Sequence, residues 1–221
     1  MSLKHVTKTS AKTFNINEQL PLVAILRGVE PKDAMRITKI LIAEGFTMIE
    51  IPLNSPNALN SINCLVENFG DKYLIGAGTV TTIEEAIDVI ATGANLIVTP
   101  NFNEQVIRAS VAADCKVFSG VVTPTEAFSA LAAGATGLKL FPISVLGING
   151  FKALTSVLPA TTICLPVGGI NPTIASMKPL MDVGAQGFGL GAALYTPSMS
   201  DDEVTENARQ FVSAYRGCLV H

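Results

Sequence analysis

The feature that most constrains this chain is a repeated pairing of a short apolar run with a longer segment of helical periodicity. The pairing occurs eight times along the 221 residues. The runs are apolar at nearly every position rather than at alternate ones, as expected for parallel strands buried on both faces. The sequence therefore predicts strands over residues 22–27, 48–53, 74–78, 96–99, 116–121, 137–141, 162–168 and 187–190.

Helix boundaries are marked between these runs. A capping side chain precedes proline at Ser55-Pro56, Thr123-Pro124 and Asn171-Pro172. Glycines suited to left-handed helix ends stand before four strands, at Gly45, Gly93, Gly134 and Gly184. One strand–helix unit is therefore predicted to recur along the chain.

Eight such units with right-handed connections close naturally into a single-domain (β/α)8 TIM barrel. A doubly wound open sheet is the alternative. We favour the barrel because no G-x-G-x-x-G motif follows the first strand, whereas glycine-rich turns follow the last two strands, where such barrels bind phosphate. We assign the barrel domain to residues 15–221 and an N-terminal extension, which we expect to be poorly ordered, to residues 1–14.

The charge pattern points to a small-molecule partner. The formal net charge is -3 and the isoelectric point is near 5.4, without a Lys/Arg run in the body of the chain. We therefore expect neither nucleic acid nor an anionic membrane as a partner. No apolar stretch approaches the roughly 20 residues of a membrane span, and the N-terminal residues lack a hydrophobic signal core, so we expect a cytoplasmic protein.

Cysteine and histidine usage argues against metal chemistry. The four cysteines are scattered without a C-x-x-C pair, and the two histidines, His5 and His221, lie at the chain ends. We therefore expect no metal site, no disulfide and no cofactor. The commonest general base is also missing from the body of the chain.

Four charged residues fall within the predicted strands: Arg27, Glu50, Lys116 and Lys139. Lys116 begins its strand and belongs to the bottom of the barrel, whereas the other three lie toward the C-terminal ends, where active sites of this fold gather. The structural alternative is a solvent-facing edge position, but a closed barrel has no edge. Because an unpaired buried charge costs several kcal/mol, a functional role is favoured.

Lys139, in G-L-K-L-F-P, is predicted to be the nucleophile. Burial and a nearby Arg27 both disfavour its ammonium form, so a neutral amine is available to attack a ketone and form an iminium. Glu50 is then the proton shuttle. The alternative is a structural salt bridge between Lys139 and Glu50 beneath a binding pocket.

The substrate-binding candidates lie at the ends of other strands. Arg27 offers a planar fork for the carboxylate of a 2-keto acid, or else only a partner for Glu50. Thr79 could complete that carboxylate site, although the sequence equally supports an ordinary threonine in a turn. Pro100 and Phe141, at the ends of the fourth and sixth strands, are further candidates.

Two glycine-containing turns, at Gly168-Gly169 and at Gly191-Ala192, follow the last two strands. Glycine lets backbone N–H groups approach an anion closely, which predicts a phosphate site there. Plain tight turns are the alternative.

The motifs around the candidate site residues resemble those of a known family. From about residue 20 to 215, the chain resembles the class I aldolase family that cleaves 2-keto-3-deoxy-6-phosphogluconate and related compounds. The shared motifs are G-L-K-L-F-P around Lys139, I-E-I-P-L-N-S-P around Glu50, V-G-G-I around Gly168 and Gly169, and G-L-G-A ending at Ala192. The resemblance implies a homotrimer and a Schiff base without a metal.

Within the family, the chain is most similar to the galactonate type. Asn54 replaces an arginine of the gluconate type, the arginine being supplied instead by Arg27, and Val167 replaces a threonine. Ala192 departs from a phosphate-binding serine in many relatives. The resemblance implies galactonate degradation by retro-aldol cleavage of a phosphorylated keto acid, 2-keto-3-deoxy-6-phosphogalactonate, to pyruvate and glyceraldehyde 3-phosphate.

Three alternatives remain open. The first is an aldolase for the gluconate epimer or for 4-hydroxy-2-oxoglutarate. The second is a phosphosugar isomerase or epimerase on the same barrel, which would use paired acids or a metal. The third is a non-catalytic sugar-phosphate binding protein, against which the combination of Glu50 with Lys139 argues.

Overall fold

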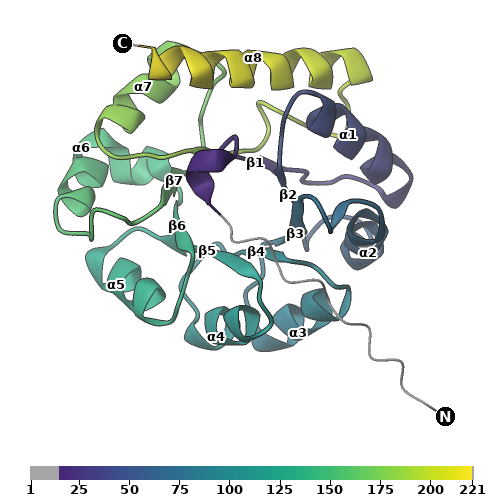
Figure 1. The fold of residues 1–221 in the computed structure, drawn as a ribbon, viewed down its shortest axis with the longest axis horizontal. Helices are drawn as coiled ribbons and strands as arrows, with labels where there is room; N and C mark the ends of the chain where they lie inside the picture. The colour runs from purple at the N-terminus through teal and green to yellow at the C-terminus, as the bar shows by residue number, and fades with distance from the viewer. Residues whose placement is uncertain (1–14, 221) are drawn as a thin grey trace.

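The computed structural model describes residues 15–220, which form a ring of parallel strands surrounded by helices (Figure 1). The strands are β1 (Leu22–Ile25), β2 (Met48–Pro52), β3 (Leu74–Gly78), β4 (Leu96–Val98), β5 (Lys116–Val121), β6 (Gly137–Leu140), β7 (Cys164–Pro166) and β8 (Phe188–Leu190). The helices are α1 (Pro31–Ala43), α2 (Ala58–Phe69), α3 (Ile83–Ala91), α4 (Glu104–Ala112), α5 (Pro124–Ala132), α6 (Ile143–Thr155), α7 (Ile174–Asp182) and α8 (Asp201–Leu219). A short 3-10 helix, η1 (Ile16–Glu18), precedes β1.

The strand order shows how the ring closes. The strands are hydrogen-bonded in the order β7-β6-β5-β4-β3-β2-β1-β8, and the paired strands run parallel. An isolated parallel bridge between Val167 and Gly189 joins the two ends of this order. The prediction of a single-domain (β/α)8 barrel is confirmed, and the open doubly wound sheet is wrong.

Apolar side chains fill the N-terminal end of the barrel interior. The buried side chains that pack together there are Ile16, Val23, Met48, Leu96, Val98, Phe118 and Leu165. Ile16 belongs to η1, which lies across the centre of the ring in Figure 1. Because successive strand side chains alternate between faces, Glu50 follows Met48 into the interior two residues further along β2. The C-terminal end of the interior is therefore where the buried charges lie.

Several strands end earlier than predicted. Arg27 lies in a turn two residues beyond β1, and Phe141 and Val167 each stand one residue beyond their strands. The apolar pattern continues past the last ladder hydrogen bond, so periodicity alone places these ends too late. In β1, the last cross-strand bond runs from the Leu26 N–H to the Glu50 carbonyl (2.9 Å).

The helix boundaries were predicted with mixed success. Thr123 caps α5 as expected, and the glycines Gly45, Gly93, Gly134 and Gly184 all have positive φ. Ser55 does not cap α2, because its hydroxyl instead accepts a hydrogen bond from the Gly28 N–H (2.9 Å). Asn171 does not cap α7 either, since Thr173 supplies the capping oxygen two residues later.

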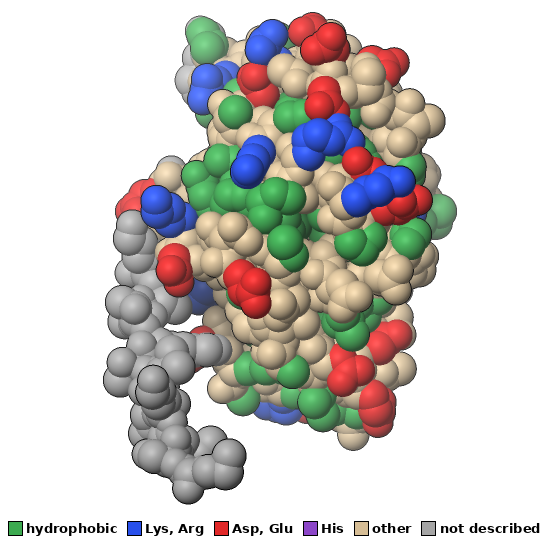
Figure 2. Space-filling model, turned by 90° about the vertical axis from the view of Figure 1, so that its right-hand side faces the viewer, with side chains coloured by type: hydrophobic (Ala, Val, Ile, Leu, Met, Phe, Trp, Pro, Cys, Tyr) green, Lys and Arg blue, Asp and Glu red, His purple; other side chains and the backbone are tan. Residues whose placement is uncertain are grey.

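Figure 2 shows the side of the molecule that carries α1 and α2, where acidic and basic side chains are interspersed. Within residues 15–220, no helix is both long and apolar enough to cross a membrane. The predicted extension over residues 1–14 and both histidines lie outside the described residues.

Candidate active site

Glu50 and Lys139 enter the barrel interior from opposite sides, because β2 and β6 are four strands apart in the ring of eight. Glu50 is 1% exposed and Lys139 is 5% exposed, and no other charged side chain of residues 15–220 is buried. In the ladder between β5 and β6, Lys139 pairs with Gly120, which lies two residues beyond the inward-facing Phe118. Because paired residues and alternate residues of a strand share a face of the sheet, Lys139 also points into the interior. The ion pairs of the described residues do not include one between Lys139 and Glu50. The structural salt bridge considered above is therefore not formed.

Glycines keep space open around these groups. A Cβ atom on Gly78 would lie 2.0 Å from the Glu50 Oε2 atom, and one on Gly120 would lie 2.2 Å from the Pro100 carbonyl carbon. A side chain at either position would collide with the wall of the site. The Glu50 Oε2 atom is buried and has no hydrogen-bond partner among the described residues. An orphaned buried acceptor of this kind costs free energy, and its presence here therefore favours a functional role for Glu50.

Burial brings the acid and the amine toward the same pH range. It raises the pKa of Glu50 to about 7, although the positive charges of Lys139 and Arg27 and a backbone hydrogen bond from Gly78 act in the opposite direction. Burial also lowers the pKa of Lys139, assisted by Arg27 and opposed by Glu50. Near neutral pH, the carboxyl group can both accept and release a proton, and the amine is less strongly held as ammonium than in water.

The Phe141 ring lies between the Lys139 amine and the first glycine turn. The Lys139 Nζ atom lies 4.8 Å from the centre of the half-buried Phe141 ring. A Cβ atom on Gly168 would lie 3.8 Å from the same ring. The peptide bond between Phe141 and Pro142 is cis. The ring therefore forms a wall between the amine and the end of β7.

The predicted carboxylate-binding residues lie at the C-terminal ends of β1 and β3. Arg27 is exposed, and its Nη1 atom donates a hydrogen bond to Asn54 Oδ1 at 2.6 Å. Thr79 is half-buried and has a φ of 58°. A β-branched residue rarely adopts this left-handed conformation, and such strain tends to persist at functional sites.

The two glycine turns, at which a phosphate site was predicted, follow the C-terminal ends of β7 and β8. Gly168 and Gly169 have φ angles of 101° and 78°, which favour glycine. No atom lies within 4 Å of where a Cβ on Gly169 or Gly191 would stand, so these turns are open. Among the described residues, the N–H of Ala192 has no backbone acceptor, and Ala192 is exposed. Open turns with free N–H groups can accept an anion.

Val167 stands at the seam where β7 meets β8. It is 6% exposed, and a Cβ atom on Gly189 would lie 2.5 Å from its Cγ2 atom. Glycine at position 189 therefore makes room for the Val167 side chain. This places Val167 between Lys139 on the neighbouring β6 and the turn after β8.

Sequence reasoning missed two of the residues that shape the site, Gly78 and Gly120, and it missed the hydrogen bond between Arg27 and Asn54. Gly76 and Gly78 stand at alternate, inward-facing positions of β3, and this spacing was a usable signal for a cleared interior. The Asn54 contact joins two turns that are 27 residues apart, for which the sequence holds no periodic signal.

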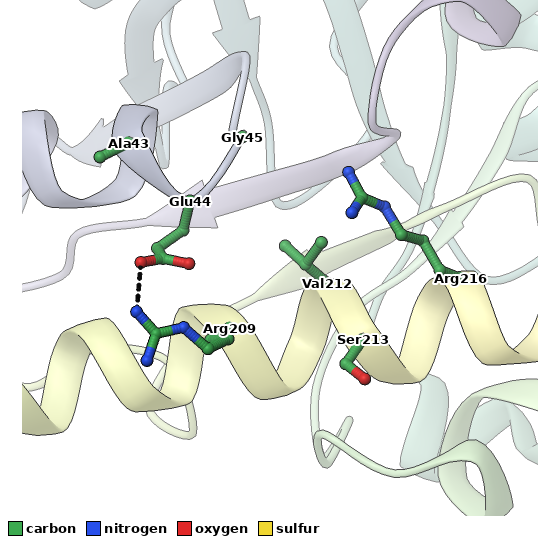
Figure 3. A pocket seen from close by; sticks show the side chains of 7 residues that line it. All are labelled: Ala43, Glu44, Gly45, Arg209, Val212, Ser213 and Arg216. Atoms are coloured by element: carbon green, nitrogen blue, oxygen red, sulfur yellow. Dashed lines mark hydrogen bonds and ion pairs between the residues drawn. The ribbon is translucent and has the colours of Figure 1, made fainter.

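Other hollows lie away from the buried charges. A cavity of about 470 Å³ between the C-terminal end of α1 and the side of α8 contains an ion pair between Arg209 and Glu44 (2.9 Å; Figure 3). A second cavity of about 460 Å³ lies beside the start of α2 and is bordered by Glu85 and Asp88 of α3. Neither is lined by Glu50 or Lys139.

Comparison with known proteins gives consistent results. The family model described as KDPG and KHG aldolase matches residues 14–206. The chain is 44% identical over 198 residues to the 2-dehydro-3-deoxy-6-phosphogalactonate aldolase of Escherichia coli K12, covering 90% of this chain and 96% of that protein.

Two solved structures extend this similarity. The native KDPGal structure matches with a TM-score of 0.87 and 44% identity, covering 90% of this chain and 96% of the other. The KDPG aldolase of Legionella pneumophila, with pyruvate captured as a covalent carbinolamine, matches with a TM-score of 0.74 and 26% identity, covering 92% and 95%.

Proposed function

Because the chain belongs to the KDPG and KHG aldolase family, we propose that it is the class I aldolase that reversibly cleaves 2-dehydro-3-deoxy-6-phosphogalactonate to pyruvate and D-glyceraldehyde 3-phosphate. The chain is a carbon–carbon lyase by its family. The observation that carries the mechanism is the placement of two buried groups, Lys139 and Glu50, on opposite sides of one barrel interior. A phosphosugar isomerase or epimerase, or a non-catalytic binding protein, does not fit a family of aldolases.

The first step forms a covalent bond between Lys139 and the substrate. The neutral amine attacks the C2 carbonyl, and the carbonyl oxygen takes up a proton to give a carbinolamine. Glu50 donates the proton with which the C2 hydroxyl leaves as water, and an iminium remains on Lys139. A carboxyl group whose pKa is raised to about 7 suits this exchange, because both protonation states are populated at neutral pH. The Legionella relative supports this step, since its pyruvate is held as a carbinolamine.

The second step breaks the bond between C3 and C4. Glu50, now a carboxylate, removes the proton of the C4 hydroxyl, and the electrons of the C3–C4 bond move into the iminium. Glyceraldehyde 3-phosphate leaves and an enamine remains on Lys139. Protonation at C3 and hydrolysis of the resulting iminium then release pyruvate and restore the amine. Every electron shift ends on the iminium, so the proposal needs no metal and no cofactor.

The remaining site residues hold the two ends of the substrate. Arg27 and Thr79 bind the carboxylate, while Pro100 and Phe141 flank the three-carbon keto-acid portion. The backbone N–H groups of Gly168, Gly169, Gly191 and Ala192 bind the phosphate. A phosphorylated keto acid is therefore the partner, with the carboxylate near β1 and β3 and the phosphate near β7 and β8.

We assign the discrimination between the two C4 epimers to Val167. The residue lies between the lysine and the phosphate turns, where the C4 hydroxyl must pass. A valine can pack against one epimer but cannot hydrogen-bond the other. Identity of 44% to a galactonate-type relative, against 26% to the Legionella KDPG aldolase, supports the same assignment. Cleavage of the gluconate epimer or of 4-hydroxy-2-oxoglutarate is the second candidate.

We also propose that the protein is a cytoplasmic homotrimer that serves galactonate degradation. Its free cysteines, Cys64, Cys115, Cys164 and Cys218, suit a reducing compartment. Apolar side chains that remain exposed on the outer helices, such as Phe128 (46%) and Ile87 (56%), are candidates for a subunit interface. Sedimentation equilibrium tests the trimer directly.

The experiment that tests the proposed function is cleavage of the two C4-epimeric substrates side by side. We expect pyruvate release from both, with a higher kcat/KM for the galactonate epimer. A higher kcat/KM for the gluconate epimer would move the assignment to the second candidate. Absence of pyruvate release from both substrates would reject the aldolase activity altogether.

A further inference from the structure

The turns that follow β1 and β2 are joined by two hydrogen bonds. Arg27 Nη1 donates to Asn54 Oδ1 at 2.6 Å, and the next residue, Gly28, donates its N–H to Ser55 Oγ at 2.9 Å. One bond holds a side chain and the other holds the backbone beside it.

The backbone around Arg27 is fixed from several directions. The Leu26 N–H donates to the Glu50 carbonyl at 2.9 Å, and Ser55, whose hydroxyl accepts from Gly28, is 6% exposed. Gly28 has a φ of 80°, and a Cβ atom on it would lie 3.0 Å from Pro197 Cγ. With the backbone held in this way, conformational freedom remains only in the exposed Arg27 side chain.

The Asn54 contact selects one direction for that side chain. β1 lies between β2 and β8, so the guanidinium could turn toward Glu50 or toward the turn at Gly191. Asn54 follows β2, and its bond therefore holds the guanidinium on the β2 side. Among the described residues, Arg27 forms no ion pair, so an uncharged amide orients it without neutralising it.

We propose that Asn54 is a positioning residue that holds the Arg27 guanidinium on the β2 side of the barrel mouth, with its remaining N–H donors free for the carboxylate of the keto acid. This inference rests on the proposed function, because Arg27 is the group through which Asn54 acts. It deepens that function by adding a residue that does not itself touch the substrate.

The test compares Asn54→Ala with Asn54→Gln, which keeps an amide acceptor, and with Asn60→Ala, a matched exposed asparagine on α2. KM is measured separately for pyruvate and for glyceraldehyde 3-phosphate in the condensation direction. For Asn54→Ala, we expect the KM for pyruvate to rise about five- to ten-fold, as for the loss of one hydrogen bond to a charged group. The KM for the aldehyde should stay within about two-fold, Asn54→Gln should recover most of the loss, and Asn60→Ala should match the wild type.

A double-mutant cycle shows whether Asn54 acts through Arg27. In an Arg27→Ala background, Asn54→Ala should have no further effect on the KM for pyruvate. A second readout is the pH midpoint for trapping pyruvate with borohydride. We expect Asn54→Ala to move that midpoint to higher pH, because a released guanidinium no longer helps to keep the pKa of Lys139 low.

The inference is overturned if Asn54→Ala leaves both the KM for pyruvate and the trapping midpoint unchanged, if the aldehyde KM rises instead, or if the loss persists in the Arg27→Ala background. Should Asn54→Ala fail to fold, Asn54→Ser carries the same comparison with a polar side chain too short to reach Arg27. A wild-type protein that never traps pyruvate would reject the proposed function itself. Trapping by the wild type together with an unchanged Asn54→Ala rejects only the role of Asn54.

Discussion

Charged side chains are buried at one end of the barrel interior and excluded from the other end. At the C-terminal end, Glu50 and Lys139 are buried without an ion pair between them, and Gly78 and Gly120 clear the space beside them. At the N-terminal end, Ile16 closes an apolar interior, and the charged groups lie outside it. The half-buried Lys116 begins β5 at that end.

On the outer surface, near the N-terminal end of the barrel, a charged group is again exposed and paired. The cavity between α1 and α8 holds an ion pair between Arg209 and Glu44 (Figure 3), in which the arginine side chain is 61% exposed. Exposed pairs of this kind contribute little to stability, whereas buried unpaired charges are costly. The cost is therefore concentrated at the end where chemistry is proposed, and variants at the two ends should differ sharply.

The largest effect is expected at Glu50. Glu50→Gln keeps the shape of the side chain but cannot transfer a proton, so we expect kcat to fall about 10²-fold or more while the fold persists. Steady-state kinetics with circular dichroism as the folding control provide the measurement. An unchanged kcat would make Glu50 a structural residue and remove the contrast between the two ends.

The same substitution should change how stability depends on pH. Because folding raises the pKa of Glu50 from 4.5 to about 7, the folded state binds the proton more tightly than the unfolded state. This contribution is fully present below pH 4.5 and is lost as the pH rises through about 7. Relative to Glu50→Gln, the wild type should lose on the order of 3 kcal/mol of unfolding free energy across that range.

Urea titrations of both proteins at several pH values measure this difference. If the two proteins keep a constant difference in unfolding free energy across the range, burial does not hold the proton on Glu50.

A smaller effect is expected at Val167, which borders the site without carrying charge. Val167→Thr introduces a hydroxyl in place of a methyl group, and we expect the kcat/KM for the gluconate epimer to rise about ten-fold relative to the galactonate epimer. Competition between the two substrates in one assay measures the ratio directly. An unmoved ratio would remove Val167 from the specificity account and leave the roles of Lys139 and Glu50 intact.

The smallest effect is expected at the opposite end. Arg209→Ala removes the exposed ion pair with Glu44 and should change kcat by less than about two-fold, with a melting temperature close to that of the wild type. Kinetics and thermal melts check both expectations. A large loss of activity would show that the α1–α8 cavity is coupled to the barrel mouth, and the two ends could then no longer be treated as independent.

The sequence predicted the parts of this contrast that follow from local pattern. Glu50 and Lys139 interrupt apolar strand runs, and a charge in such a run is visible without a structure. The ring of parallel strands follows from the same runs. These signals are local because each depends on the residues of one strand and its following turn.

Other features depend on contacts between distant segments. Ser55 has the sequence of a helix cap but accepts from the Gly28 N–H, because the neighbouring turn offers a competing donor. Gly78 clears space for Glu50 only through the pairing of β2 with β3. The left-handed conformation of Thr79 has no local signal, since a β-branched residue disfavours it.

The most direct test of the central claim is to treat the protein with pyruvate and borohydride and to locate the adduct by peptide mass spectrometry. The account predicts a three-carbon acid joined to Lys139 and inactivation in proportion to its formation, while Lys116, at the other end of the barrel, remains unmodified. An adduct on Lys116 or on a surface lysine, or full activity with no adduct, would contradict the Schiff-base mechanism.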